Sequence, residues 1–416
     1  MRIHAPNQSM SDGAMSFETP EQVKLINSQI DRFIEQEVKP LEEEYPQFLG
    51  EDRERNMVDG DHRLVDEYLE LRDKIHQKSV DAGFYTMAMP ERVGGGGLNA
   101  LEDTMVMEHL HNRDPDGYHT LIFDRLSVDH SIIPLYDDDY QREKYFEPVM
   151  NAEKHMTFGL TEPDHGSDPT WMDSTAEKGG DEWVINGTKA FISNSVEADF
   201  IMVHARTSGE DGDADGISTF LVDRDNPGWE IGKIQRSMGT KQGAQAINHF
   251  NDCRVPESQM VGEEGQGFRT AMTWVGAGRL HIPAKAVGIS QWMFDRSVEY
   301  AENRKTFGEP IGSRQSIQEL LVEMRVAIEQ VRWLYRYTAW KMDRGEEYRW
   351  LQSAAKLQGA NLWCDVADNA IQIHGGAGYM KSLPFEGLYR DGRVTRIYEG
   401  SDEIQKRTIA RRFLDL

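Results

Sequence analysis

The chain has 416 residues, a formal net charge of -25 at pH 7 and a hydrophobic content of 38%. This length allows two or three domains around a sizeable core. The acidic charge argues against nucleic acid or an anionic membrane as a partner, because there is no basic stripe to neutralise phosphates. No run of 18 apolar residues is present and residues 1–15 lack an apolar signal region, so we expect a cytoplasmic protein without membrane insertion.

Two cysteines, Cys253 and Cys364, are too few for a disulfide framework, and no Cys/His spacing resembles a metal site. We therefore expect no metal and two cysteines that act as small buried hydrophobic residues. Arginine outnumbers lysine among the 46 basic residues. Together with the acidic excess this indicates either a high-salt cytoplasm or an ordinary acidic protein, and composition leaves both open.

The first part of the chain, from about residue 20 to 150, has a helical pattern of apolar residues. One apolar face is formed by Val23, Ile26, Ile30, Phe33 and Ile34. The polar stretch 45–62 is expected to be an exposed connection. We predict an N-terminal helical domain over residues 1–154.

Between about residues 155 and 265 the pattern changes to short strands. Asn186-Gly187 separates two apolar runs and predicts a hairpin with a type I′ turn, because both residues accept the positive φ angles of that turn. Further strands are expected at 199–205, 218–223 and 246–252. We predict a small central β-domain over residues 155–265.

After Gly267 the helical pattern returns and continues to the C-terminus. The core face of one long helix is predicted from residues at helical spacing, namely Ile317, Leu320, Leu321, Met324, Ile328, Val331 and Leu334. We predict a C-terminal helical bundle over residues 266–416. The fold class is then α+β, mainly α, in the order helical, β, helical.

The motif Tyr398-Glu399-Gly400 is the strongest candidate for chemistry. A carboxylate removes a proton from carbon only in a dry site that raises its basicity. Gly400 would allow a flat ligand to approach the backbone closely. The alternative is a solvated Glu399 ahead of a helix whose first turn carries Asp402 and Glu403.

Three further motifs accompany this one, at residues 159–168 (GLTEPDHGSD), 304–308 (RKTFG) and 372–379 (QIHGGAGY). In this order and at these separations, over about residues 20 to 412, the chain resembles the acyl-CoA dehydrogenase family. The resemblance implies an N-terminal helical domain, a central β-domain and a C-terminal four-helix bundle. It also implies an FAD-dependent enzyme of fatty acid β-oxidation that converts an acyl-CoA to the trans-2-enoyl-CoA and passes electrons to an electron-transferring flavoprotein.

This reaction needs a base for the α proton, an acceptor for the β hydride and polarisation of the thioester carbonyl. The resemblance makes Glu399 the base. It implies that the Glu399 backbone N–H and a ribityl hydroxyl of the flavin bind the thioester oxygen. It also places Gly400 at the substrate, and Ser401 and Glu403 at the cofactor.

Within the central domain, the resemblance assigns Thr161, Gly166 and Ser167 to the flavin ring and its phosphates, with Ser167 also at the substrate. It assigns Phe191 to the face of the ring and Ser193 to a hydrogen bond with N5. The alternatives are ordinary turn chemistry for Thr161 and Ser167, and an ordinary pair of strand residues after a hairpin for Phe191 and Ser193.

Cofactor contacts across a subunit interface are implied for Arg304, Thr306, Phe307 and Gln315, with Arg304 at the pyrophosphate of the neighbour's FAD. Gln372, Gly375 and Gly376 are assigned to the adenine side of the cofactor, the alternative for the glycines being a helix C-cap. A shared cofactor requires a dimer, and the resemblance implies a homotetramer built as a dimer of dimers.

At the substrate, the resemblance assigns Arg279 to the thioester and pantetheine channel and Arg411 to bound CoA, the alternative for each being a surface ion pair. One departure is Gly276, which stands where medium-chain enzymes of the family have an acidic residue, so the resemblance leaves one CoA contact open at this position. In a branch of the family the base occupies the position of Gly278, and glycine cannot act as a base.

Two other functions are compatible with the motifs. One is an oxygen-reactive flavin oxidase or monooxygenase of the same fold, and the other is a non-catalytic protein that binds flavin or acyl-CoA. Glu399 argues against the second, because a binding protein has no use for a base there. The sequence does not indicate the length or branching of the acyl group.

Overall fold

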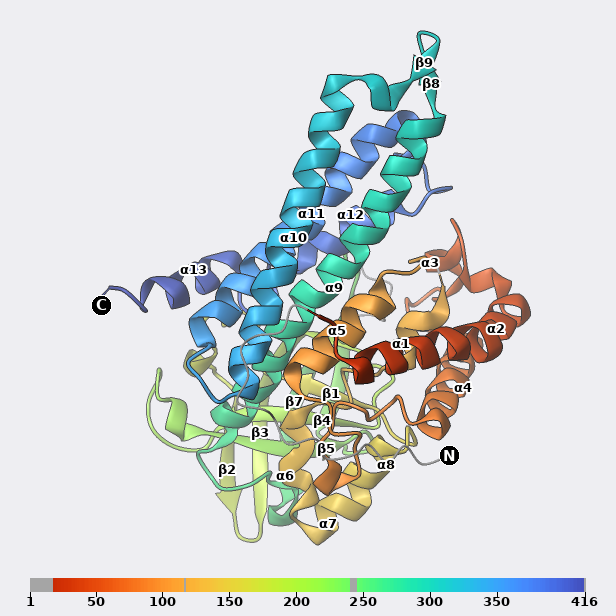
Figure 1. Ribbon diagram of the computed structural model, residues 1–416. Helices are drawn as coiled ribbons and strands as arrows, with labels where there is room; N and C mark the ends of the chain where they lie inside the picture. The colour runs from red at the N-terminus through yellow and green to blue at the C-terminus, as the bar shows by residue number, and fades with distance from the viewer. Residues whose placement is uncertain (1–17, 116, 240–244, 415–416) are drawn as a thin grey trace.

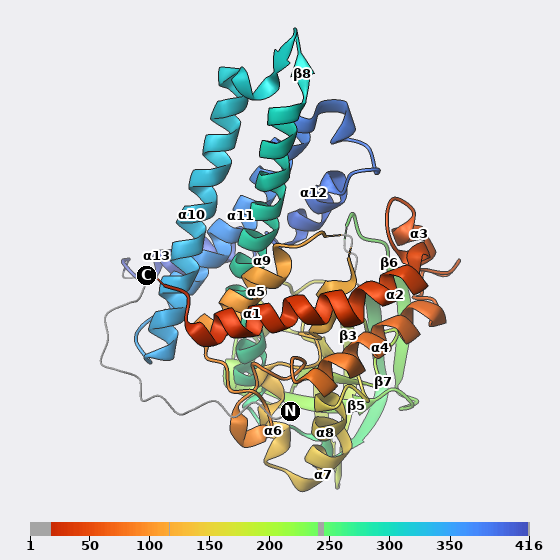
Figure 2. The ribbon, with the colours of Figure 1, turned by 45° about the vertical axis from the view of Figure 1, so that its right-hand side comes forward.

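The computed structural model describes residues 18–115, 117–239 and 245–414. Helices from both ends of the chain surround a small sheet formed by its middle (Figure 1). The long helices of the C-terminal region, blue-green to blue, extend away from the sheet, and the N-terminal helices, red to yellow, lie against it (Figures 1 and 2). The predicted α+β, mainly α fold class is confirmed.

The N-terminal region is built on α1 (Glu21–Phe33), α2 (Lys39–Glu44), α4 (Asp66–Ala82) and α5 (Ala100–His111). As expected from the apolar face of α1, Val23, Ile30 and Phe33 are buried. The start of α5 is fixed by a capping box between Asn99 and Glu102. Shorter helical pieces complete this region: η1 (Ile34–Val38), η2 (Pro46–Phe48), α3 (Arg53–Asn56), η3 (Glu91–Val93), η4 (Tyr118–Ile122), η5 (His130–Ile132), α6 (Ile133–Tyr136), α7 (Asp139–Gln141), η6 (Arg142–Phe146) and α8 (Glu147–Met150).

The prediction that residues 45–62 form an exposed connection is wrong for its apolar members. Tyr45, Phe48 and Met57 are all buried in the N-terminal core. Phe48 packs edge-on against Tyr68 with ring centroids 5.3 Å apart. Polar residues surround these side chains in the sequence, so the apolar pattern did not reveal them. They are buried because η2 and α3 turn the segment back onto α4.

The central sheet has the strand order β1-β4-β2-β3-β7-β6, with β5 paired to β4. Its strands are β1 (Met156–Gly159), β2 (Thr175–Gly179), β3 (Glu182–Ser193), β4 (Phe200–Arg206), β5 (Ile217–Asp223), β6 (Trp229–Gln235) and β7 (Gln245–Pro256), with η7 (Pro169–Trp171), η8 (Ala214–Gly216) and η9 (Glu257–Gln259) in the connections. The strands expected at 199–205, 218–223 and 246–252 are confirmed as β4, β5 and β7.

The predicted hairpin turn at Asn186-Gly187 is wrong. These two residues lie inside the continuous strand β3, at a bulge opposite β7, and the chain turns instead between β2 and β3 at Gly180. A Cβ on Gly187 would lie 2.1 Å from Ser174 Oγ, and the Asp252 N–H donates to Asn186 Oδ1 at 2.8 Å. The pair is therefore used for close packing within the sheet.

The C-terminal bundle consists of α9 (Gly267–Asn303), α10 (Gln315–Asp343), α11 (Arg349–His374) and α12 (Phe385–Val394), followed by α13 (Asp402–Ala410). A two-stranded hairpin, β8 (Lys305–Thr306) and β9 (Glu309–Pro310), and η10 (Ile311–Ser313) join α9 to α10, and η11 (Gly375–Ala377) follows α11. α9 begins at Gly267 as predicted. Glycine is required at this position because the helix start packs closely on the sheet, where a Cβ on Gly267 would lie 2.4 Å from the Ser218 carbonyl carbon.

The predicted core face of α10 is confirmed at its centre, where Met324, Ile328 and Val331 are buried. Ile317, Leu320, Leu321 and Leu334 are only partly buried. Of the two free cysteines, Cys253 is buried and Cys364 is partly exposed. No helix in the described ranges is long and apolar enough to cross a membrane, and the prediction for residues 1–15 lies outside those ranges.

Candidate active site

Glu399 lies in the turn between α12 and α13, where the backbone is left-handed at two successive residues. Glu399 has φ 56° and Gly400 has φ 87°. This turn directs the Glu399 side chain onto α9 at Gly278, where a Cβ would lie 2.8 Å from both Glu399 Cγ and Cδ. The carboxyl group therefore occupies the space that a side chain at position 278 would fill.

Three side chains hold the carbonyl groups of this turn. Arg279 Nε donates to the Glu399 carbonyl oxygen at 2.9 Å, and Lys356 Nζ donates to the Gly400 carbonyl oxygen at 2.6 Å. Gln405 Nε2 donates to both oxygens at 2.9 Å. No described residue accepts the Glu399 N–H. Hydrogen bonds to the carbonyl oxygens of Glu399 and Gly400 therefore fix the turn, and the Glu399 N–H has no partner among the described residues.

Glu399 is partly exposed as a residue, but its carboxyl group is largely removed from water against α9. Burial raises its pKa to about 8, although the cations of Arg279 and Lys356 and a hydrogen bond from Trp274 act in the opposite direction. The buried carboxyl of Asp129 lies close enough to raise the pKa further. A dry carboxylate with a high proton affinity is what proton abstraction from carbon requires.

The loop after β1 carries Thr161, Gly166 and Ser167, and a buried ion pair anchors it to β3. Lys189 Nζ lies 2.6 Å from Glu162 Oε1, with side-chain exposures of 0% and 2%. The Thr161 carbonyl accepts the Ala190 N–H at 2.9 Å. Gly166 and Ser167 remain exposed, and a Cβ on Gly166 would meet nothing within 4 Å. Backbone and hydroxyl groups are thus presented on an open face of a well-anchored loop.

Phe191 adopts a strained conformation at the bulge near the end of β3. Its φ is 60°, its N–H donates to Gln235 Oε1 at 3.2 Å, and 59% of the residue is exposed. Ser193 follows two residues later, and its carbonyl accepts Thr157 Oγ1 at 2.7 Å. A strained, outward-facing aromatic ring is costly unless something covers it, and a flat aromatic cofactor fits that surface.

Trp274 of α9 connects this sheet edge with Glu399. Its ring stacks on Phe158 of β1 at a centroid distance of 4.7 Å, and its indole lies close enough to the Glu399 carboxyl to lower the pKa of that group. Phe158 lies three residues before Thr161. The structure therefore brings the loop after β1 and the proposed base to the same end of α9.

The residues around Arg304 lie at the other end of the bundle, beside the β8–β9 hairpin at the top of Figure 1. Arg304 is 26 residues along α9 from Gly278, which corresponds to about 39 Å of helix. The stack of Tyr300 on His374, with centroids 4.3 Å apart, places the end of α11 at this tip as well. One group is therefore gathered far from Glu399 of the same chain: Arg304, Thr306, Phe307, Gln315, Gln372, Gly375 and Gly376.

Side chains in this distant group are mostly exposed. Phe307 is 98% exposed with φ 52°, and Gln315, at the start of α10, bonds only Glu319 among the described residues. Gly375 is the C-cap of α11 with φ 60°, as the helix-cap alternative proposed. A Cβ on Gly375 or Gly376 would meet nothing within 4 Å, so both present open backbone.

The remaining candidates lie around α13. Ser401 is its N-cap and accepts the Ile404 N–H at 3.4 Å, while Glu403 is an exposed residue in its first turn. Arg411 is exposed just after the helix. Arg279, in contrast, is not a surface ion pair, because it is partly buried and donates to the Glu399 carbonyl.

Sequence reasoning missed the supporting residues Lys356, Gln405, Trp274, Glu162 and Lys189. Lys189 and Lys356 are both fully buried. The sequence signal for these two lysines is their position, within the apolar run of β3 and on the apolar side of α11. A buried cation needs a dedicated partner, so a lysine at such a position indicates a specific contact.

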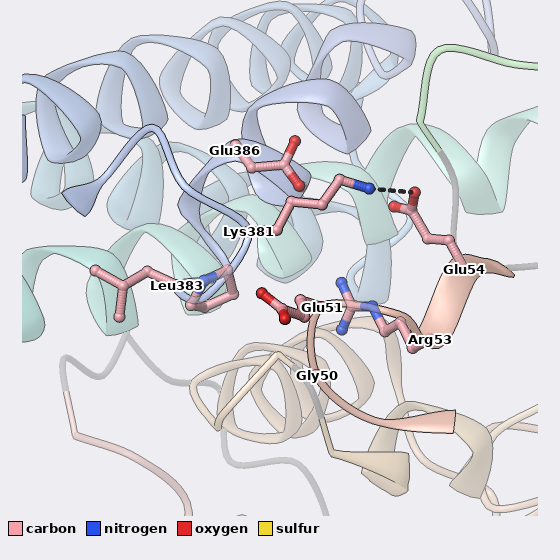
Figure 3. Close-up of a pocket in the computed structure, with 9 residues that line it drawn as sticks. Gly50, Glu51, Arg53, Glu54, Lys381, Leu383 and Glu386 are labelled. Carbon is pink, nitrogen blue, oxygen red and sulfur yellow. Dashed lines mark ion pairs between the residues drawn. The ribbon is translucent and has the colours of Figure 1, made fainter. Parts of the chain in front are cut away.

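A charged hollow on the surface lies apart from these residues, between α3 and the segment before α12 (Figure 3). Lys381 Nζ lies 4.0 Å from Glu54 Oε2 across it, and Arg390 bonds both Glu54 and Glu386. None of the predicted site residues lines this hollow. It is an ion-pair network that joins the N-terminal region to α12.

Three family models cover almost the whole chain. They are the N-terminal domain of acyl-CoA dehydrogenase at residues 19–153, the middle domain at 157–253 and the C-terminal domain at 265–414. The chain is 37% identical over 338 residues to the mitochondrial short-chain specific acyl-CoA dehydrogenase of Rattus norvegicus, covering 80% of this chain and 81% of the relative. It is 34% identical to a 3-(aryl)acrylate reductase of Clostridium sporogenes, covering 95% and 99%.

Solved structures agree with these relatives. Butyryl-CoA dehydrogenase from Megasphaera elsdenii is 29% identical with a TM-score of 0.80, covering 96% of this chain and 99% of that one. The FAD complex of PigA is 26% identical with a TM-score of 0.84 and the same coverage. The chain belongs to the acyl-CoA dehydrogenase family of FAD-dependent oxidoreductases that act on acyl-CoA thioesters.

Proposed function

We propose that the protein oxidises a short acyl-CoA to the trans-2-enoyl-CoA, with an electron-transferring flavoprotein as electron acceptor. The observation that carries this proposal is Glu399, a carboxyl whose burial raises its pKa to about 8, beside a backbone N–H that no described residue accepts. The names of the Rattus norvegicus relative and the Megasphaera elsdenii structure favour a short acyl group.

Glu399 removes the α proton in this proposal. Its high proton affinity favours the transfer, and Gly278 leaves room for the carboxyl to sit against α9. The free N–H of Glu399 donates to the thioester oxygen, where negative charge increases in the transition state. Arg279, Lys356 and Gln405 keep that donor in place by binding the carbonyl groups of the same turn.

FAD, when bound, supplies the hydride acceptor for the β carbon. We assign its ring to Thr161, Phe191 and Ser193, and its phosphates to the exposed Gly166 and Ser167. Ser401 and Glu403 also face the cofactor, while Ser167, Arg279, Gly400 and Arg411 bind the substrate. The exposed ring of Phe191 and the open backbone at Gly166 support this assignment.

A second subunit completes each cofactor site in this proposal. The group around Arg304 lies about 39 Å along α9 from the Gly278 contact, which is too far to serve the same FAD. Its open, charged tip suits the pyrophosphate and adenine of a neighbouring chain's cofactor. We therefore propose a homotetramer arranged as a dimer of dimers. Arg304→Ala should release FAD on gel filtration, and retention equal to that of the unmodified protein would refute the shared site.

Glu399→Gln tests the base directly. The amide keeps the shape of the side chain but cannot accept the proton, so binding of butyryl-CoA should persist while anaerobic flavin bleaching slows by at least about 10³-fold. Glu347→Gln, an exposed change near the bundle end, is the matched control and should bleach normally. Normal bleaching by Glu399→Gln would assign the base elsewhere. A panel of short, medium, long, branched and aromatic acyl-CoAs would then define the acyl group.

The name of the Clostridium sporogenes relative favours a second candidate, in which the same site reduces an enoyl group and Glu399 returns the proton. Comparing bleaching by butyryl-CoA with reoxidation of the reduced enzyme by crotonyl-CoA separates the two directions. Oxygen reactivity, as in an oxidase or monooxygenase of the same fold, is tested by measuring peroxide in air. Rapid peroxide formation would identify oxygen, and not the electron-transferring flavoprotein, as the electron acceptor.

A further inference from the structure

A second cluster of polar side chains lies where the N-terminal helices meet the sheet. Asp73 and His76 are one turn apart on α4, and His155 immediately precedes β1. One potential ligand atom from each lies within 4.8 Å of the other two. We propose that these three residues bind a divalent transition-metal ion, with Zn²⁺ as the best chemical match for two imidazoles and one carboxylate.

The spacing of the cluster fits a tetrahedral site. His155 Nε2 lies 3.1 Å from Asp73 Oδ1. Ligand bonds of about 2.0–2.1 Å in a tetrahedron place neighbouring ligand atoms about 3.3 Å apart. The His155–Asp73 pair already has this spacing, and a shift of His76 by at most about 1.5 Å brings the third atom to it, since all three lie within 4.8 Å of one another. The fourth position is left for water.

His76 is the residue whose chemistry is otherwise unexplained. It is only 3% exposed, yet neither ring nitrogen hydrogen-bonds any described residue, and Nδ1 is completely buried. A buried polar nitrogen without a partner is destabilising. A metal ion bound through Nδ1 would give this nitrogen the partner that the described residues do not supply.

His155 is oriented in the way that metal-bound histidines usually are. Its Nδ1 lies 3.1 Å from Asp124 Oδ2, while Asp124 Oδ1 accepts the N–H groups of Leu126 and Ser127. The backbone N–H of His155 donates to Asp199 Oδ2 at 2.8 Å. A carboxylate on the far ring nitrogen leaves Nε2 directed at the cluster and increases its basicity as a ligand.

Two features compete with the ion. Arg72 Nε donates to Asp73 Oδ1 at 2.9 Å, so the metal must displace this contact or use the other carboxylate oxygen. A second proton on the His155 ring would instead make the cluster an ion pair of the imidazolium with Asp73 and Asp124. Asp73 has a side-chain exposure of 50%, so solvent and ions reach the cluster from its side.

Such an ion would join α4 to the strand that leads into the loop of Thr161, and would stabilise the packing of the N-terminal helices on the sheet. The sequence predicted no metal because His155 is 79 residues from His76, and only the fold brings them together. The site is separate from the residues assigned to FAD and acyl-CoA.

The test uses the FAD-loaded enzyme after chelator treatment, titrated with ZnCl₂ and separately with CoCl₂. We expect one bound ion per chain by elemental analysis, a d–d absorption band of tetrahedral Co²⁺, and a rise of a few degrees in Tm. No stoichiometric binding would overturn the proposal and leave the protonated His155 ion pair as the state of the cluster.

Two variants locate the ion. His76→Phe keeps an aromatic ring in the core, and Asp73→Asn keeps the shape of a half-exposed side chain. Each should weaken Zn²⁺ binding by at least about tenfold, the effect expected for loss of a ligand or its support. His62→Asn, a histidine in a left-handed turn outside the cluster, should bind Zn²⁺ as tightly as the unmodified protein. Equal binding by Asp73→Asn and His76→Phe would place the ion elsewhere and refute the site.

Discussion

Replacing Gly278 with alanine tests the placement of the base by moving it without removing it. The new Cβ would lie 2.8 Å from Glu399 Cγ and Cδ and 3.1 Å from Oε1, whereas ordinary contact begins at 3.4 Å. The carboxyl must therefore move by about 0.6 Å or more to restore van der Waals contact. The atoms that must yield belong to a side chain, so the helix itself stays in place.

The expected result is a loss of rate without a loss of stability. A displacement approaching 1 Å at the reacting group costs about 10²-fold, or about 2.7 kcal/mol in the activation free energy. Alanine also raises helix propensity by up to about 1 kcal/mol relative to glycine, so the unfolding temperature of Gly278→Ala should be equal or higher.

Gly276 provides the matched control, two residues earlier on α9. A Cβ there would meet nothing within 4 Å, so Gly276→Ala gains the same helix propensity and leaves Glu399 in place. The assay is the rate of anaerobic flavin bleaching by butyryl-CoA in stopped flow, with FAD content and Tm measured in parallel. If Gly278→Ala bleaches within about threefold of Gly276→Ala, the Glu399 carboxyl does not act from the position against α9.

Three further results follow from the charges of the site. Burial raises the pKa of Glu399 to about 8, and the base acts in its deprotonated form. We therefore expect kcat/KM to rise about tenfold per pH unit below pH 8 and to level off above it. A flat profile from pH 6 to 9 would contradict this expectation. Lys356→Gln removes a cation that lowers the pKa of Glu399, so the midpoint of that profile should move to higher pH, and a shift to lower pH would be inconsistent with the contact. Lys189→Met leaves Glu162 buried without its partner, so stability should fall by about 3–5 kcal/mol as measured by thermal unfolding, and the double change with Glu162→Gln should recover much of it.

The order of helical and β regions was predictable because the period of apolar residues is a local property of the sequence. The central part of the α10 face and the strands β4, β5 and β7 were found in this way. The hairpin at Asn186-Gly187 was wrong because a dipeptide rule cannot detect Ser174 packed against Gly187. The domain limits at 154/155 and 265/266 stay a prediction.

Candidate site residues could be proposed from the sequence where they belong to a motif, but the residues that only support a motif could not. Glu399 is part of a short, recognisable segment. Its supports Arg279, Lys356 and Gln405 come from three different helices, and only the fold brings them to the two carbonyl groups of the turn. Arg279 was assigned to the substrate channel, but its hydrogen bond to the Glu399 carbonyl also gives it a part in holding the turn that carries the proposed base.

Several residues of the candidate site share a strained backbone conformation that local sequence patterns do not predict. Seven described residues other than glycine have positive φ, and three of them are Phe191, Glu399 and Phe307, from the candidate site. An aromatic or charged residue in this region costs about 1–3 kcal/mol, so the fold must stabilise each of these conformations. At Glu399 the stabilising groups are visible, since three side chains bind the carbonyl oxygens of the turn. Phe307, 98% exposed at the bundle tip, has no comparable support within the described chain, which is consistent with a surface that a neighbouring subunit covers.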